Sequence, residues 1–344
     1  MGYRLRYVST VAALVVLALA TPLSAQASTA LQLRASVNPN ISNSMPLVRV
    51  YFSQDVRASA LPALDVHPAL LTTWEQIGPR AVQAVVRGRL WPLAHYALDV
   101  PTALRCSPKC SFTSVRVVDA GVATDVNWLD QLLATLHYLP LTFTPTVAPS
   151  DPASPTTGTY TWSYANLPSR LSALWQPGAA NVILTGALMA FQNDHQLPTT
   201  GGADVATWRA LVSAVDQHQV DDHPYSYVDV SMSQPETLTL YVGRTTSFHS
   251  LVNTGISVSP TQLGTYPVYL RYTSQTMSGT NPDGTHYSDP GIPWVSYFNG
   301  GDALHGFIRS TYGWPQSLGC VEMPFAAAKT IWPSTPIGTL VSVH

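Results

Sequence analysis

Charged residues are scarce in this chain of 344 residues: they make up 10% of it, where about 25% is usual for a soluble protein. Only two lysines are present, Lys109 and Lys329, and the formal net charge is -2. Binding to a phosphate backbone needs clustered basic residues, so the composition argues against a nucleic-acid partner. After residue 27, no apolar run reaches the roughly 20 residues of a membrane-spanning helix.

What the chain does contain is apolar residues, at 46%, and 28 prolines. The apolar share is enough to bury cores, and the length corresponds to about two to three domains of roughly 150 residues. Many prolines together with frequent Ser, Thr and Gly favour short strands joined by turns. We therefore expect a multidomain, mainly β protein.

Residues 1–27 have the features of an export signal. Arg4 and Arg6 give a positive start, residues 11–20 are apolar, and Ala25-Gln26-Ala27 is a small-residue cleavage site. The apolar stretch has about half the length of a spanning helix, which favours cleavage over an uncleaved anchor. We expect a secreted protein in which disulfides persist.

The three cysteines are an odd number for a secreted protein. Cys106 and Cys110 are separated by three residues in a loop context with Pro108, and we interpret them as a local disulfide. Two unpaired thiols are the alternative; a zinc half-site is less favoured because no second Cys or His pair with ligand spacing follows nearby. Cys320 is left alone, either as a buried small hydrophobe or as a reactive thiol.

Residues 30–121 alternate in strand fashion, which predicts a small β-sandwich. The strand at 48–56, Trp74 and the Tyr-x-Leu-x-Val strand at 96–100 resemble those of bacterial immunoglobulin-like modules. A further strand is expected at 113–117. No chemistry is evident in this segment, so we expect a spacer.

Residues 122–217 change to a helical period. Three faces are expected, formed by Trp128, Leu132, Leu133 and Leu136, by Val182, Leu184, Leu188 and Phe191, and by Val205, Trp208, Leu211, Val212 and Val215. Asp204 is placed to cap the last helix. The stretch 142–160, rich in Pro, Ser and Thr, predicts a surface loop or an inserted linker.

Part of this helical segment, residues 188–211, resembles the three-helix peptidoglycan-binding repeat of cell-wall enzymes. The residues that carry the likeness are Ala190-Phe191-Gln192, Leu197, Gly201, Asp204, Thr207-Trp208 and Leu211. The resemblance implies binding to glycan strands without naming a contact residue. Residues 218–224 are expected to be a polar linker; this explains His218, Asp221, Asp222 and His223 better than a metal site does.

From 225 to 344 the strand pattern returns, with strands expected at 225–232, at 238–242 and, after a turn at Gly264, at 266–272. Residues 325–332 are expected to be helical. We therefore expect a second mostly-β domain over 225–344.

This last segment places His305-Gly306 ahead of Ser317-Leu318-Gly319-Cys320. A thiol with a pKa of about 8.5 is mostly protonated at neutral pH, and an adjacent imidazole can accept its proton. His305 is the nearest histidine in sequence. Gly319 lets the backbone approach a substrate, so the N–H groups of Gly319 and Cys320 could hold an oxyanion. Gly306 removes bulk beside the base.

Ser317 is a competing nucleophile. Pro315 stands where the Gly-x-Ser-x-Gly elbow of hydrolases needs its first glycine, which argues against Ser317 in that role.

Together these residues resemble the catalytic domain of the YkuD-type L,D-transpeptidases, whose signature is a His followed by Ser/Thr-His-Gly-Cys. The likeness also includes residues 228–231, the turn and strand at 264–268, Pro293-Trp294 with Tyr297-Phe298, and the helical residues 325–332. Two positions depart from the pattern: Leu318 replaces the usual His, and Glu322 replaces the usual Arg or Asn. The first leaves His305 as the base, and the second puts recognition of the substrate carboxylate in doubt.

The resemblance implies Cys320 as nucleophile, His305 as base, Ser317 and Gly319 as supporting residues and Tyr297 as a wall of the pocket. It implies acyl transfer from a stem tetrapeptide, with loss of D-alanine, to an acceptor amine, giving 3→3 cross-links. The partners would be the stem peptides and glycan strands of a bacterial cell wall, with roles in wall biogenesis and cell shape. No metal or organic cofactor is expected, and we expect a monomer.

Two alternatives remain at this point. In the first, water captures the thioester and the protein is an L,D-carboxypeptidase that trims D-alanine. In the second, Leu318 and Glu322 mark the decay of the site, and the protein is an inactive wall-binding protein.

Overall fold

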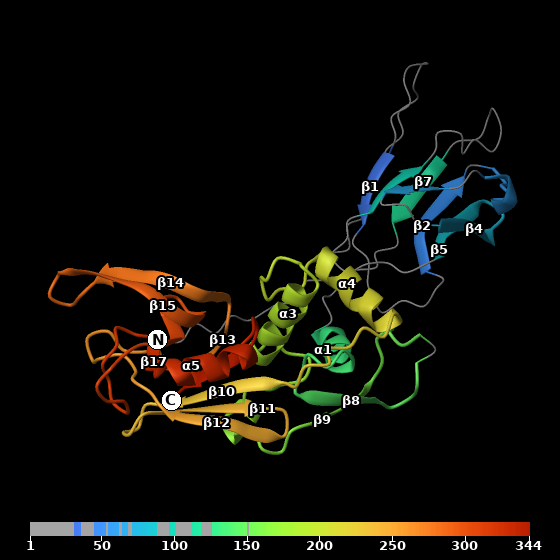
Figure 1. Ribbon diagram of the computed structural model, residues 1–344. Coiled ribbons are helices and arrows are strands. Elements are labelled where there is room, and N and C mark those ends of the chain that lie inside the picture. The colour runs from blue at the N-terminus through green and yellow to red at the C-terminus, as the bar shows by residue number, and fades with distance from the viewer. Residues whose placement is uncertain are drawn as a thin grey trace, which may run out of the picture. The chain divides into compact units, whose positions relative to one another are not determined.

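The computed structural model of the chain divides into two compact units, Met1–Thr124 and Asp125–His344, and each is described by itself (Figure 1). The described residues are 31–35, 45–52, 54–61, 64–67, 71–87, 96–100, 112–117, 126–149 and 151–344. The predicted signal, residues 1–27, and the predicted pair Cys106 and Cys110 lie outside these ranges, so both stay predictions.

The described part of the first unit consists of two antiparallel sheets, ordered β1-β6-β3 and β4-β5-β2-β7. Their strands are β1 (Leu31–Ala35), β2 (Met45–Phe52), β3 (Asp65–His67), β4 (Leu71–Gly78), β5 (Ala81–Arg87), β6 (Tyr96–Val100) and β7 (Phe112–Val117), with a 3-10 turn at Ala58–Ala60. Strands expected near 48, 96 and 113 are confirmed. The immunoglobulin-like identity stays a prediction.

Helices follow in the second unit, as the change of period predicted. They are α1 (Val126–Thr135), α2 (Ser169–Ser172), α3 (Val182–Asp194) and α4 (Val205–Asp216). The predicted cap is confirmed, because Asp204 Oδ1 accepts from Thr207 N at 2.8 Å. The buried rings of Trp128 and Trp208 lie 4.7 Å apart and join α1 to α4.

The expected loop at 142–160 is wrong at both ends. β8 (Leu141–Pro145) and β9 (Gly158–Trp162) pair as an antiparallel hairpin around the irregular middle of this stretch. The reason is the aromatic side chains among the Pro, Ser and Thr residues: Phe143 and Tyr160 face each other across the hairpin, with ring centroids 5.0 Å apart.

Residues 226–343 contain two sheets. One has the order β12-β11-β10-β18-β13 and the other β14-β15-β16-β17. The strands are β10 (Ser226–Ser231), β11 (Thr237–Val242), β12 (Thr245–Leu251), β13 (Gly264–Pro267), β14 (Leu270–Thr280), β15 (His286–Asn299), β16 (Asp302–Gly306), β17 (Val321–Met323) and β18 (Leu340–Val343).

The single strand expected at 266–272 is wrong. It is divided between the two sheets: β13 pairs with β18, and β14 pairs with β15. The backbone changes partner at the junction, where Val268 N donates to Thr339 O at 2.8 Å and Tyr269 N donates to Tyr297 O at 2.9 Å.

A shared core joins these two sheets. It contains buried residues of both, such as Val228, Val341, Leu304 and Met323, together with Ala327, Ala328 and Ile331 of α5 (Phe325–Ile331). The predicted helix at 325–332 is confirmed, and a 3-10 turn at Trp332–Ser334 follows it. The core holds β16 next to β17 in parallel register, with His305 opposite Glu322.

The helical segment packs directly on this core. A Cβ added to Gly186 of α3 would lie 2.6 Å from Gly338 O, so a larger residue does not fit there. Arg170 Nη1 lies 3.2 Å from Asp229 Oδ1 of β10. The predicted division into separate domains at 122–217 and 225–344, with a linker at 218–224, stays a prediction.

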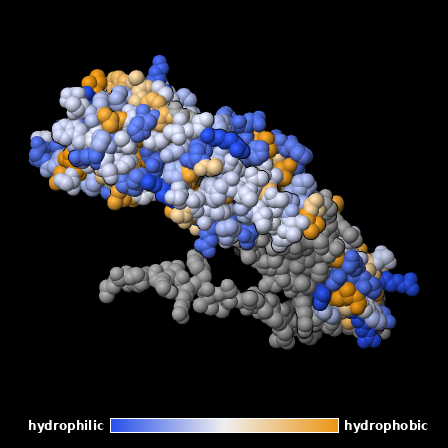
Figure 2. All heavy atoms as spheres, turned by 90° about the horizontal axis from the view of Figure 1, so that it is seen from below, coloured by the Kyte–Doolittle hydropathy of each residue, from blue (hydrophilic) through white to orange (hydrophobic). Residues whose placement is uncertain are grey.

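Among the described residues, no helix has the length and apolar character to cross a membrane. On the face drawn in Figure 2, hydrophobic atoms of the described residues form small separate patches among hydrophilic ones.

Candidate active site

His305 and Cys320 line one cavity of about 830 Å³ in the second unit. One wall is the segment 313–320, which we call the nucleophile loop, together with Glu322. The opposite wall is the hairpin of β14 and β15, which we call the arm; it contributes Gln275, Met277 and Tyr297, among others. The fold thus brings together the histidine and the cysteine that the sequence singled out.

Cys320 is the one free cysteine among the described residues. It is half-buried and packs on a small apolar cluster of Ile292, Val295 and Ala303. Burial raises the pKa of the Cys320 thiol to about 12, opposed by the Ala303 backbone N–H and assisted by the charges of Asp302 and Glu322. The thiol is therefore protonated at neutral pH, and attack on a substrate needs a base.

His305, the predicted base, is 3% exposed. Its Nδ1 lies 3.0 Å from Gly306 O; a carbonyl oxygen only accepts, so Nδ1 carries the proton and Nε2 is the basic nitrogen. Burial lowers the His305 pKa, opposed by the Gly306 carbonyl and the charge of Glu322. The ring is therefore neutral at neutral pH. Within residues 151–344, no hydrogen bond joins it to the Cys320 sulfur.

Ser317 acts as a clamp inside the nucleophile loop. Its buried hydroxyl donates to Cys320 O at 2.5 Å and accepts from Gly319 N at 3.2 Å. The Gly319 N–H, one of the two predicted oxyanion donors, is thus occupied. The Cys320 N–H makes no turn or loop hydrogen bond within residues 151–344.

The backbone conformation at position 319 requires a glycine. Its φ is +122°, and an added Cβ would lie 2.4 Å from Asp302 Oδ1. The positive φ and the nearby Asp302 therefore require glycine here, and the predicted approach of this backbone to a substrate stays a prediction. Gly306 was expected to remove bulk beside the base, but its close neighbours are Phe325 and Pro293. An added Cβ would lie 2.8 Å from Phe325 and 3.2 Å from Pro293. The glycine therefore allows α5 to approach β16.

Two hydroxyl residues hold the loop from outside. Thr261 Oγ1 donates to Gly319 O at 2.7 Å and accepts from Gly255 N at 2.9 Å. Ser259 Oγ donates to Leu318 O at 2.9 Å. Sequence reasoning missed both, because Ser and Thr are frequent in this chain and lie about sixty positions from their partners along it.

A second, fully buried layer lies behind the loop. Glu236 accepts from Thr254 N and from Thr254 Oγ1, both at 2.7 Å. Thr254 O in turn accepts from Gln316 N and Ser317 N. Burial raises the Glu236 pKa, opposed by the two hydrogen bonds from Thr254. This carboxyl group fixes the segment on which the loop rests.

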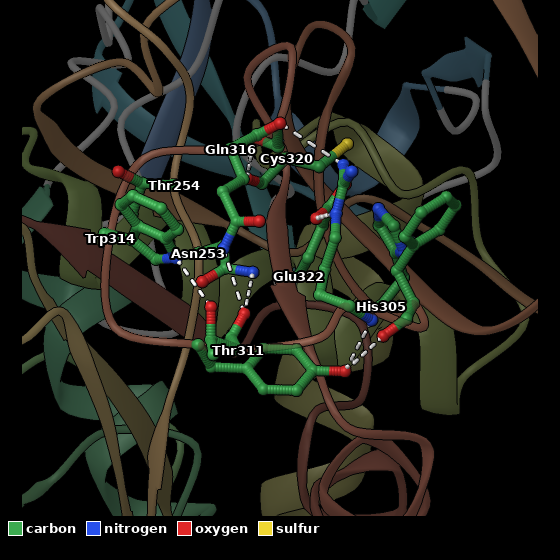
Figure 3. Close-up of polar contacts among 12 residues, drawn as sticks. Asn253, Thr254, His305, Thr311, Trp314, Gln316, Cys320 and Glu322 are labelled. Carbon is green, nitrogen blue, oxygen red and sulfur yellow. Dashed lines mark hydrogen bonds and ion pairs between the residues drawn. The ribbon is translucent and has the colours of Figure 1, made fainter.

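Asn253 fastens the start of the loop (Figure 3). Its Oδ1 accepts from Gly313 N at 3.1 Å and its Nδ2 donates to Thr311 O at 3.4 Å. The side chains of Gln316 and Trp314 also donate to Thr311. The backbone of Asn253 bridges that of Glu322 at 2.9 Å in both directions.

Glu322 has a partner that the sequence did not reveal. It is 5% exposed and forms a two-point ion pair with Arg309, with Nε to Oε2 at 2.7 Å and Nη2 to Oε1 at 2.9 Å. Arg309 Nη2 also donates to Gln316 O at 3.2 Å. The pair connects the segment after His305 to the strand after Cys320.

Tyr297 lies where the sequence placed it, on the cavity wall. Gln275 of the arm donates to its hydroxyl, and burial raises the Tyr297 pKa. Leu318 also lines the cavity, so an apolar side chain stands at this position of the motif. The described residues contain no group of three or more His, Cys, Asp or Glu side chains that could hold a metal ion.

The segment that contains the motif, the cavity and the two sheets is also similar to a known protein family. Residues 225–343 match the YkuD family model, the L,D-transpeptidase catalytic domain. The match covers about a third of the chain and confirms the likeness predicted for 225–344. No curated protein matches the chain.

Solved structures of L,D-transpeptidases are also similar to this chain. The catalytic domain of the E. faecium L,D-transpeptidase is 23% identical, with 36% of this chain and 100% of that chain covered and a TM-score of 0.32. The L,D-transpeptidase from Mycobacterium smegmatis is 11% identical, with 92% and 97% covered and a TM-score of 0.33.

Proposed function

We propose that this protein is a peptidoglycan L,D-transpeptidase in which Cys320 is the nucleophile and His305 the base. One observation carries the proposal: within the domain that matches the L,D-transpeptidase model, the free thiol and a buried, neutral imidazole line the same cavity. Peptidoglycan stem peptides would be the substrates, outside the cytoplasmic membrane.

The first half-reaction acylates Cys320. As its sulfur attacks the carbonyl carbon that joins the third stem residue to the terminal D-alanine, the thiol proton moves to His305 Nε2. The negative charge on the carbonyl oxygen would be met by the Cys320 N–H. The carbon–nitrogen bond then breaks, His305 returns the proton to the departing amine, and a thioester remains.

The second half-reaction restores the thiol. The side-chain amine of an acceptor's third residue attacks the thioester carbon and gives a proton to His305. The carbon–sulfur bond breaks, the sulfur takes up that proton, and a 3→3 cross-link is released. Attack by water instead would give a tripeptide.

The resting protonation states support concerted proton transfer rather than a stored thiolate. The raised pKa of Cys320 and the lowered pKa of His305 both disfavour an ion pair before substrate enters. Catalytic hydrogen bonds commonly tighten only in the substrate complex. We propose that His305 and the Cys320 sulfur meet when a stem peptide fills the cavity.

The test uses purified disaccharide-tetrapeptides, with products identified by mass. We expect wild type to form the 3→3 dimer and Cys320→Ala to form none. His305→Gln should lower the yield at least about 100-fold, since general acid–base catalysis contributes about that much or more. His249→Gln, at an exposed histidine of β12, is the matched control and should retain the wild-type yield.

Two results would contradict the proposal. Dimer formation by Cys320→Ala would exclude Cys320 as the nucleophile. Tripeptide without dimer from wild type would show that water is the acceptor and that the protein is a carboxypeptidase.

A further inference from the structure

Arg309 is the only arginine or lysine among the described residues that line the cavity. Its guanidinium is held on three sides: Glu322 engages Nε and Nη2, Gln316 O accepts from Nη2 at 3.2 Å, and the Phe307 ring lies 4.7 Å from Cζ. The side chain is nevertheless 30% exposed. Such a fork is fixed in orientation while part of it still faces the cavity.

One nitrogen of that fork has no partner. Within residues 151–344, no hydrogen bond or ion pair of Arg309 involves Nη1. Its two N–H groups are donors that a ligand can use, and arginine is well suited to binding carboxylates through such donors. Because Glu322 keeps the Arg309 pKa raised, the donor stays charged.

The ion pair also lies on the nucleophile's side of the cavity. Glu322 is two residues beyond Cys320, and both residues line the cavity. Glu322 is the register partner of His305. Arg309 is therefore anchored beside the residues that perform the chemistry, and its free nitrogen is available to a group close to the reacting bond.

We propose that Arg309 Nη1 binds the α-carboxylate of the amino acid that the donor peptide loses, and that Glu322 positions Arg309 for this contact. This inference rests on the proposed function. In a donor stem, that carboxylate is two bonds from the nitrogen of the bond that breaks, and it is the only anionic group so close to it. Arg309 thus selects donors with a free C-terminal carboxylate.

The alternative is a purely structural ion pair that closes the segment 307–316. Loss of such a pair would slow the reaction of every donor to the same extent. Loss of a carboxylate contact would slow only the donors that carry the carboxylate. The ratio of the two rates therefore separates the two roles, independently of any general loss of activity.

The experiment measures acylation of Cys320 by intact-protein mass, using a tetrapeptide donor with a free C-terminal carboxylate and the same donor with a C-terminal amide. Arg309→Met alone would leave Glu322 buried without its partner, which can prevent folding. The test therefore compares Glu322→Gln with Arg309→Met/Glu322→Gln, after thermal melting has shown both to be folded. Arg244→Met, at an exposed arginine outside this cavity, is the matched control.

We expect wild type and Arg244→Met to prefer the acid donor in kcat/KM. In the double variant, the acid-to-amide ratio should fall at least about 10-fold below that of Glu322→Gln, as loss of a charge-assisted hydrogen bond predicts. An equal slowing of both donors would overturn the inference and leave the proposed function standing. Failure of both donors to acylate wild type would overturn the inference and the proposed function together.

Discussion

The nucleophile loop, residues 313–320, and the arm, residues 270–299, face the same cavity but are held in different ways. The loop contains buried Ser317 and Gly319, and its backbone is hydrogen-bonded to the side chains of Asn253, Ser259 and Thr261. Along the arm, exposed and half-buried residues alternate for most of β14, and its tip is closed by local bonds such as Asn281 N to Thr285 O.

This difference shows that the rest of the domain stabilises the nucleophile loop more than the outer arm. Backbone groups of the loop are hydrogen-bonded to buried polar side chains. Loss of such a partner leaves an unsatisfied buried atom and lowers the stability of the fold. The outer arm, residues 276–291, is stabilised by its own strand ladder, and its packed apolar contact is Met277 on the cluster of Ile292, Val295 and Ala303. We expect changes in the outer arm to affect substrate handling and changes in the loop to affect both folding and chemistry.

Excision of the outer arm should have the largest effect on activity. Gln275 pairs with Ile292, so replacing residues 276–291 by Asn-Gly, a strong hairpin turn, should retain the base. We expect dimer formation to fall at least about 100-fold, because mispositioned substrate commonly costs that much, while Tm changes by only a few degrees. Loss of the folded state would show that the outer arm is part of the core, and unchanged dimer formation would exclude it as a substrate wall.

Removal of the Ser317 hydroxyl should have an intermediate effect on both properties. Ser317→Ala leaves Gly319 N and Cys320 O without their partner, at a cost of about 1–3 kcal/mol in unfolding free energy, and we expect about a 10-fold lower kcat. Denaturant unfolding and dimer formation measure the two. The control is Thr280→Ala on the arm, whose exposed hydroxyl lies 3.2 Å from His286 Nδ1. An equal effect of the two substitutions would abolish the distinction between the walls.

The smallest expected effect is a pH dependence carried by Glu236. Its pKa is raised above the usual 4.5 by burial, so its protonated form favours folding: this contribution is complete below pH 4.5 and is lost as pH rises through the folded-state pKa. Glu236→Gln removes the dependence.

Relative to the variant, wild type should therefore lose stability between pH 4 and pH 7. Unfolding in urea at both pH values measures it, with Asp222→Asn at an exposed carboxylate as the control. A stability difference that stays constant across this range would contradict the raised pKa.

Much of the secondary structure was predictable because it depends on neighbouring residues. The helical period over residues 182–191 and the cap at Asp204 are local signals, and both are confirmed. The hairpin within 142–160 and the division of 266–272 were missed because both depend on pairing between separate segments. At 268–269, the chain changes from a partner near residue 339 to one near residue 297.

Within the candidate site, the sequence pointed to the residues that we propose for the chemistry but not to those that hold them in place. His305 and the Gly319-Cys320 pair stood out through their residue types and spacing. Thr261, Glu236 and Asn253 gave no such signal: Thr261 bonds to Gly319 from 58 positions away. Such contacts depend on how the strands are arranged.

By itself, the sequence determined the order of the segments and the likeness of residues 225–343 to the L,D-transpeptidase catalytic domain, which the family comparison confirms. Only the tertiary structure decided that the Cys320 thiol is neutral at rest, that Ser317 occupies the Gly319 N–H, and that Glu322 is paired with Arg309. The physical reason is that motifs are local, whereas burial and hydrogen-bond partners come from segments that only folding brings together.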